Sequence, residues 1–106
     1  MTRLAEAVAF VDLETTGTTA TRDRVTEVAI VRVVGGEPVE EWSTLVDPGC
    51  PIPEDIQALT GITNDMVRGA PSFERIAAEV HERLEGHLFV AHNARFDYGF
   101  ICNAFT

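Results

Sequence analysis

Three stretches of the chain carry the apolar, β-branched pattern that favours strands. The first covers residues 7–13 (AVAFVDL), and the second covers residues 25–34 (VTEVAIVRVV). The second ends at Gly35-Gly36, a pair that is typical of a two-residue hairpin turn. A third strand is expected to run back over residues 39–46. The pattern therefore predicts a three-stranded antiparallel meander.

Residues 47–71 are rich in proline, glycine and small polar side chains, which exclude a long regular element. Pro53 can open a short helix there, and Thr63 can cap another. We therefore expect a structured connection rather than a flexible linker.

An amphipathic helix is predicted after Ser72, which can serve as its cap, and Gly86 supplies its stop. Apolar side chains recur at intervals of three and four residues on one face, and charged side chains lie elsewhere. We expect the apolar face to pack on the sheet. The apolar set is Phe73, Ile76, Ala77, Val80 and Leu84, and the charged set is Glu74, Glu79, Glu82 and Arg83.

Residues 87–91 (HLFVA) are predicted to form a short buried strand. Because a helix precedes it, this strand is expected to run parallel to the first through a right-handed crossover, which gives the sheet order 3-2-1-4. Asn93 is expected to cap a further helix, with Asp97 one turn in. The core stripe of that helix is Phe96, Phe100, Ile101 and Ala104. The predicted fold class is therefore α/β, a mixed sheet with flanking helices.

The composition is that of one soluble domain. The 106 residues are 45% hydrophobic and 24% charged, and no apolar run reaches the ~20 residues of a membrane helix. The N-terminus does not resemble a signal peptide, so a cytoplasmic protein is expected. Cys50 and Cys102 lie far apart and suit reduced thiols. The net charge of −9 disfavours a passive nucleic-acid binder, so a nucleic-acid ligand would need cations to mediate its binding.

The candidate chemistry lies where the first predicted strand ends. Asp12 and Glu14 are two residues apart on one strand, so their carboxylates point to the same face. Asp97 follows the fourth strand, and parallel neighbours end at the same edge of a sheet. Three acids crowded there would repel one another unless protonated or bound to cations, and hard oxygen ligands select Mg²⁺ or Mn²⁺. The competing interpretations are a solvated strand end for Asp12 and Glu14, and a helix-dipole contact for Asp97.

Four segments resemble the DEDD-type, or DnaQ-like, 3′-to-5′ exonucleases, whose fold is ribonuclease H-like. The first family motif is similar to FVDLETTG at residues 10–17, and the second is similar to AHNARFDYGF at residues 91–100. TEVAIVRV and LTGITNDMVRGAPSF, at residues 26–33 and 59–73, resemble the segments between them. The resemblance spans the chain, includes proofreading subunits of DNA polymerase III, and through HNARFD favours the histidine-containing (DEDDh) branch.

The resemblance implies that Asp12, Glu14 and Asp97 are metal ligands in a two-ion site for Mg²⁺ or Mn²⁺. It implies hydrolysis of terminal phosphodiesters of nucleic acid, with release of nucleoside monophosphates. The expected substrate contacts are Thr15, Thr16, Gly17, Leu59, Thr60, Asn93 and Phe96, of which the resemblance suggests Leu59, Thr60 and Phe96. Leu59 and Phe96 also suit ordinary core positions, Asn93 suits a simple cap, and the three residues after Glu14 suit an ordinary turn.

The family's third motif supplies a histidine and a fourth aspartate beyond the second motif, and the 106 residues do not contain it. We therefore expect residues 1–106 to be the N-terminal portion of a single exonuclease domain, with the C-terminal part of the fold missing. Such a fragment is expected to be weakly active or inactive, because a general base and a ligand are absent. Its uncovered apolar surface would favour self-association.

Two other function classes fit the residues less well. The first is a non-catalytic, exonuclease-like interaction module. The second is a phosphoacceptor receiver domain modified at Asp12, whose parallel sheet conflicts with the hairpin at Gly35-Gly36. The expected partners are a single-stranded or 3′-end nucleic acid, DNA rather than RNA, and a DNA polymerase subunit, with no membrane.

Overall fold

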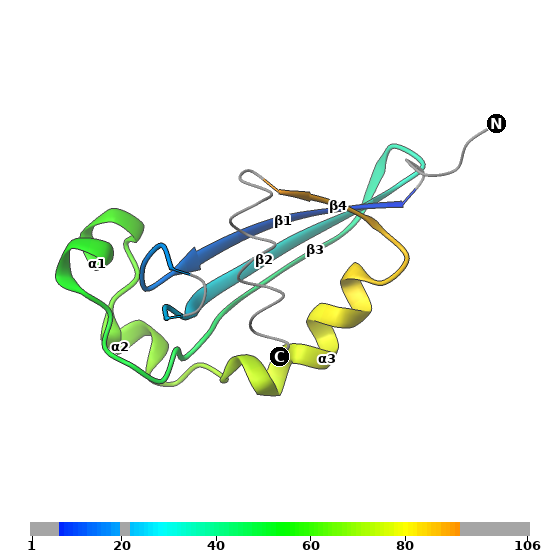
Figure 1. Cartoon of the computed structure of the whole chain (residues 1–106). Coiled ribbons are helices and arrows are strands. Elements are labelled where there is room, and N and C mark those ends of the chain that lie inside the picture. The colour runs from blue at the N-terminus through cyan, green and yellow to red at the C-terminus, as the bar shows by residue number, and fades with distance from the viewer. Residues whose placement is uncertain (1–6, 20–21, 92–106) are drawn as a thin grey trace.

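A computed structural model describes residues 7–19 and 22–91 (Figure 1). Four strands form one mixed sheet in the order β3-β2-β1-β4, with β1 antiparallel to β2, β2 antiparallel to β3, and β1 parallel to β4. This arrangement confirms the predicted meander and crossover. The elements are β1 (Ala7–Thr15), β2 (Val25–Val34), β3 (Glu37–Leu45), α1 (Glu54–Thr60), α2 (Asn64–Val67), α3 (Phe73–Leu84) and β4 (Leu88–Ala91).

The hairpin between β2 and β3 forms where the sequence predicts it. Gly35 and Gly36 have φ values of 60° and 83°, and a two-residue turn of this kind needs positive φ at both central positions. A side chain at either position would strain the backbone. The two glycines therefore fix the register that pairs Val34 with Glu37.

Strand β1 is two residues longer than the predicted range 7–13, since it continues through Thr15. Glu14 pairs with Glu27 of β2, and the register then shifts so that Thr15 pairs with Val25. Both acidic residues of β1 therefore lie inside the strand and not in the turn that follows it.

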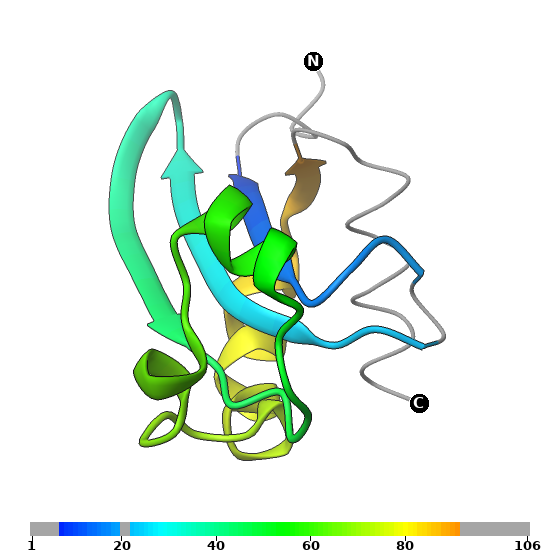
Figure 2. The same ribbon diagram turned by 90° about the vertical axis from the view of Figure 1, so that its left-hand side faces the viewer.

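Helix α3 covers one face of the sheet (Figures 1 and 2), and the main core lies between them. Ile76 and Val80 of α3 are buried there, as the helical periodicity predicts. Ser72 is the N-cap residue, although its side chain makes no cap hydrogen bond. The sheet contributes Ala9, Val11, Leu13, Val25, Val28 and Ile30, and Val46 completes the buried cluster.

Arg83 departs from the expectation that the charged residues of α3 avoid the core face. Its guanidinium lies 4.3 Å from the centre of the Trp42 ring, and its Nη2 lies 3.1 Å from the Glu40 carboxylate. Arg32 also pairs with Glu40, at 3.3 Å. The long aliphatic stem of arginine can follow an apolar surface while its head meets a partner, so this charged side chain helps to attach α3 to the sheet.

The connection after β3 contains the two expected short helices, and they enclose a second buried cluster of Ile52, Ile62 and Val67. Thr63 caps α2 by accepting a hydrogen bond from Met66 N, as predicted. Both views place α1 beside the end of the sheet at which β1 ends (Figures 1 and 2). This connection therefore borders the edge that carries the acidic pair.

Strand β4 is less buried than expected, since Leu88 is 51% exposed. Its partners on β1 alternate between the two faces, and Leu88 and Val90 lie with Val8 and Phe10 on the face opposite α3. We call this the open face. The predicted cap at Asn93 and the helix that follows it lie outside the described residues. Within the described ranges no helix is long and apolar enough to cross a membrane.

Candidate active site

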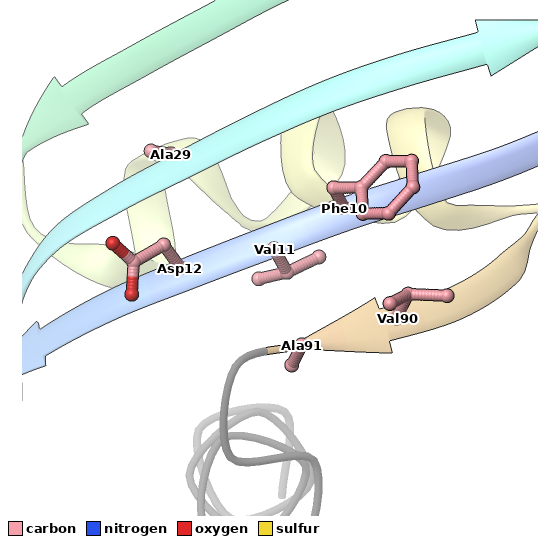
Figure 3. A pocket seen from close by; sticks show the side chains of 6 residues that line it. All are labelled: Phe10, Val11, Asp12, Ala29, Val90 and Ala91. Carbon is pink, nitrogen blue, oxygen red and sulfur yellow. The ribbon is translucent and has the colours of Figure 1, made fainter.

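Asp12 and Glu14 share the open face of the sheet, as strand alternation predicts. Val11, Leu13 and Thr15 are buried on the α3 side, whereas Asp12 is exposed and Glu14 is half-buried. Figure 3 shows the Asp12 carboxylate projecting from β1 on the side of β2, the strand that carries its paired residue Ala29. The structure therefore brings two oxygen donors together near the carboxyl end of β1.

The Glu14 carboxyl is in an environment that opposes its charge. Partial burial raises its pKa above the ordinary value of 4.5, and the negative charges of Asp12 and Glu27 raise the pKa further. Glu27 is the residue directly opposite Glu14 on β2. The sequence did not indicate this third acid, because the hairpin glycines set only the β2–β3 register, whereas Glu27 meets Glu14 through the β1–β2 register.

None of these three carboxylates forms a salt bridge with a residue in ranges 7–19 and 22–91. Unneutralised carboxylate oxygens are the donor set that hard divalent cations prefer. The residues present therefore fit an Mg²⁺ or Mn²⁺ ion. No group of three or more potential ligands is arranged to hold a metal within the described part of the chain, so the β1 pair would need a further ligand.

A pocket of about 270 Å³ adjoins Asp12 on the open face (Figure 3). Its walls come from β1, β2 and β4, and they are apolar except for the Asp12 carboxylate. Pockets that bind small organic groups commonly combine apolar walls with a few polar groups that fix orientation. The described lining residues are Phe10, Val11, Asp12, Ala29, Val90 and Ala91.

The turn after Glu14 is held by its own side chains. Thr15 and Thr16 are 8% and 3% exposed, and the Thr15 hydroxyl donates to the Gly17 carbonyl. The Thr16 hydroxyl donates to Asp23 at 3.1 Å and accepts from Arg24 N at 3.0 Å. Within the described residues the N–H groups of Gly17 and Thr18 donate to no other group. The turn therefore offers backbone groups rather than threonine hydroxyls.

The two residues suggested on α1 have different environments. Leu59 is 80% exposed, so the interpretation of Leu59 as an ordinary core residue is wrong. The Thr60 hydroxyl donates to Ile56 O and accepts from Ile62 N, which ties it to the end of the helix. Leu59 is thus a large apolar side chain left in solvent on α1, the helix that lies beside this end of the sheet (Figures 1 and 2).

Asp97, Asn93 and Phe96 lie outside the described residues. The convergence of Asp97 on Asp12 and Glu14 therefore stays a prediction, as do the substrate contacts of Asn93 and Phe96. The parallel pairing of β1 with β4, from Val8 with Leu88 to Val11 with Ala91, is the arrangement on which that prediction depends.

Comparison with known proteins identifies the family to which this chain belongs. Residues 9–106 match the model of the RNase_T exonuclease family. The chain therefore belongs to the exonuclease family, and the resemblance noted in the sequence is confirmed.

Among curated relatives, the chain is 41% identical over 101 residues to a PolC-type DNA polymerase III from Halalkalibacterium halodurans. It is also 41% identical over 92 residues to the 3′-5′ exonuclease DinG from Bacillus subtilis. These matches cover 95% and 86% of this chain, but only 7% and 10% of the relatives. The chain thus corresponds to a small part of each relative.

Solved structures confirm the ribonuclease H-like fold. Product-bound exonuclease I superposes with a TM-score of 0.84 over 93% of this chain and 25% of its own, at 24% identity. Exonuclease X in complex with 5′ overhanging duplex DNA gives a TM-score of 0.76 and 32% identity, over 89% of this chain and 53% of its own. The predicted sheet order is therefore the order of a known exonuclease architecture.

Proposed function

We propose that residues 1–106 are the N-terminal portion of a single 3′-to-5′ exonuclease domain. The domain would hydrolyse the terminal phosphodiester of a nucleic acid and release nucleoside monophosphates. The observation that carries this proposal is the pair of carboxylates, Asp12 and Glu14, on one face of β1, which form no salt bridge with any residue in ranges 7–19 and 22–91, in a chain of the exonuclease family.

Asp12 and Glu14 would hold Mg²⁺ or Mn²⁺, with Asp97 as the further ligand that the family resemblance implies. Such an ion supplies positive charge to a phosphoryl group and lowers the pKa of a bound water. The protein positions the oxygen donors: β1 fixes their spacing, and β2 places Glu27 opposite Glu14. The raised pKa of Glu14 supports this role, because a nearby cation would relieve the repulsion that raises it.

The substrate side of the site would combine apolar contact with backbone hydrogen bonds. Leu59 is available for contact with the terminal base, since 80% of its surface is exposed. The N–H groups of Gly17 and Thr18, which donate to no acceptor among residues 7–19 and 22–91, would meet phosphate or sugar oxygens. Because neither type of contact reads base edges, we expect little sequence discrimination.

The proposed substrate is a 3′ end of DNA rather than RNA, and the proposed protein partner is a DNA polymerase subunit. The relatives named as DNA polymerase III and the exonuclease X complex with DNA support this choice. We place the activity in the cytoplasm. The acidic composition is compatible with a polyanionic substrate only if bound cations reverse the local field.

The test is nuclease activity of the full-length protein on single-stranded DNA and RNA oligonucleotides of equal sequence. We expect release of nucleoside monophosphates from the 3′ end with Mn²⁺ or Mg²⁺, and none with a chelator. Labelling each end of the oligonucleotide in turn distinguishes 3′-to-5′ degradation from degradation in the opposite direction.

Asp12→Asn should abolish this activity, because it removes one ligand charge while keeping the side-chain size. The matched control is Asp65→Asn on α2, whose side chain is 82% exposed in a surface pair with Arg68. Equal activity of wild type and Asp12→Asn would contradict the proposed site. Metal binding without any hydrolysis would instead favour the non-catalytic interaction module.

A further inference from the structure

The carboxylate of Asp23 holds the turn that follows the acidic strand. One of its oxygens accepts from the Thr16 hydroxyl at 3.1 Å, and the other accepts from the backbone N–H of Thr19 at 3.1 Å. The Asp23 N–H donates in return to the Thr19 carbonyl at 2.7 Å. Both oxygens of this half-buried side chain are therefore engaged by the turn.

Thr16, the first residue after β1, is the second residue that holds this turn. Its N–H donates to Arg24 O at 2.8 Å, and its hydroxyl accepts from Arg24 N at 3.0 Å while donating to Asp23. With only 3% of its surface exposed, Thr16 depends on these partners, because a buried hydroxyl without them would be costly. The start of β2 thereby fixes the residue two positions beyond Glu14.

Gly17 shows how closely the Asp23 carboxylate approaches the turn. A Cβ atom built on Gly17 would lie 2.5 to 2.7 Å from the three carboxylate atoms of Asp23, which is closer than such contacts allow. The φ of Gly17 is not in the left-handed region. The requirement for glycine here therefore comes from the neighbouring carboxylate and not from the backbone conformation.

We propose that Asp23 is a positioning residue, which fixes residues 16–19 so that the N–H groups of Gly17 and Thr18 meet the terminal nucleotide beside Asp12 and Glu14. This inference rests on the proposed function. Asp23 itself touches neither the substrate nor the metal. Its contribution is to substrate binding, because the turn that it holds contacts the nucleotide before and during hydrolysis.

Steady-state kinetics of the full-length protein on a single-stranded DNA oligonucleotide with Mn²⁺ test this role. Asp23→Ala should raise KM by about tenfold, the effect of one lost hydrogen bond or slightly more, with kcat changed by less than about threefold. A side chain needed only for folding would lower the active fraction, and so the apparent kcat, and leave KM unchanged.

Asp23→Asn is the conservative variant that should restore KM to within about threefold of wild type. Its amide oxygen can accept from Thr19 N, and its NH₂ group can donate to the Thr16 hydroxyl, which has two lone pairs. Asp65→Ala removes an acid of the same type from a surface pair on α2, and it should change neither KM nor kcat.

Gly17→Ala provides a second perturbation that keeps the Asp23 side chain and is informative even if Asp23→Ala does not fold. Its methyl group should displace the carboxylate and raise KM by about tenfold. In the double variant with Asp23→Ala the methyl group meets no carboxylate, so the two effects should not add.

Three results would overturn the inference alone. The first two are an unchanged KM for Asp23→Ala in an otherwise active protein and additive effects of about a hundredfold in the double variant. The third is a loss of binding in Asp23→Asn equal to that in Asp23→Ala, since the amide keeps a hydrogen bond to both Thr19 and Thr16, the latter with donor and acceptor exchanged. A wild-type protein without nuclease activity would overturn the proposed function, and this inference with it.

Discussion

Leu59→Ala tests whether Leu59 contributes to substrate binding or to the stability of the fold. The Leu59 side chain is 80% exposed, so the free protein gains little from it, and its removal should change the free energy of unfolding by less than about 0.5 kcal/mol. Alanine is also slightly the better helix former, which opposes any loss within α1. The free protein should therefore tolerate the substitution.

The effect on substrate binding should be much larger. The substitution removes three carbon groups, each worth about 0.8 kcal/mol when buried. Because four-fifths of the side chain is available for new burial against a base, the largest loss is about 2 kcal/mol, or roughly a 30-fold weaker affinity. Contact with only half of the side chain would reduce the loss to about fivefold.

The measurement is the affinity of the full-length protein for a single-stranded oligonucleotide, with urea unfolding of the same preparations. Val39→Ala is the matched control, since Val39 is 52% exposed on β3 near the hairpin, at the other end of the sheet. An affinity within twofold of wild type would refute the assigned contact. A loss of more than about 1 kcal/mol of stability would show that Leu59 is needed by the fold.

Three further predictions concern the acidic pair and the open face. The pKa of Glu14 is raised in the folded state, so its ionised carboxylate lowers the free energy of unfolding at pH values above that pKa. Below the unfolded-state value near 4.5 the group is protonated in both states and has no such effect. Glu14→Gln should therefore raise the thermal midpoint of the metal-free chain at pH 7 but not at pH 3. Mn²⁺ at 100 times its dissociation constant should stabilise the wild type by about 2.7 kcal/mol, and an equal gain for Asp12→Asn in the same thermal scan would contradict the metal site. Leu88→Glu should reduce self-association of the 106-residue chain in light scattering, because Leu88 is 51% exposed on the apolar open face. The same change at Met66, which is 47% exposed on helix α2 and outside the sheet, should have no effect if the open face is the contact.

Much of the fold could be predicted because its determinants are local. Strand alternation, the glycine pair at residues 35–36 and the helical period after Ser72 each depend on neighbours within a few positions of the chain. The parallel pairing of β4 followed from the handedness of crossovers, which leaves few topologies for a strand–helix–strand unit. The same alternation placed Asp12 and Glu14 on one face.

Residues whose roles depend on distant partners could not be found in this way. Arg83 carries a charge at a helical position that looks solvent-facing, and its contacts with the Trp42 ring and Glu40 on β3 explain why it is only 16% exposed. Glu27 looks like an ordinary polar position of β2 until the register places it opposite Glu14. In both cases the energy comes from a contact between elements.

The candidate metal chemistry could be predicted from the sequence by itself, because acids are depleted in strands and two of them on one face repel each other unless a cation neutralises them. The residue that holds the turn beside this site could be identified only from the tertiary structure. Asp23 lies nine residues beyond Glu14 in a polar stretch that carries no pattern, and it becomes significant only when the start of β2 returns beside the end of β1. Periodicity specifies which face a side chain occupies, whereas the partner across a turn is set by how the chain closes on itself.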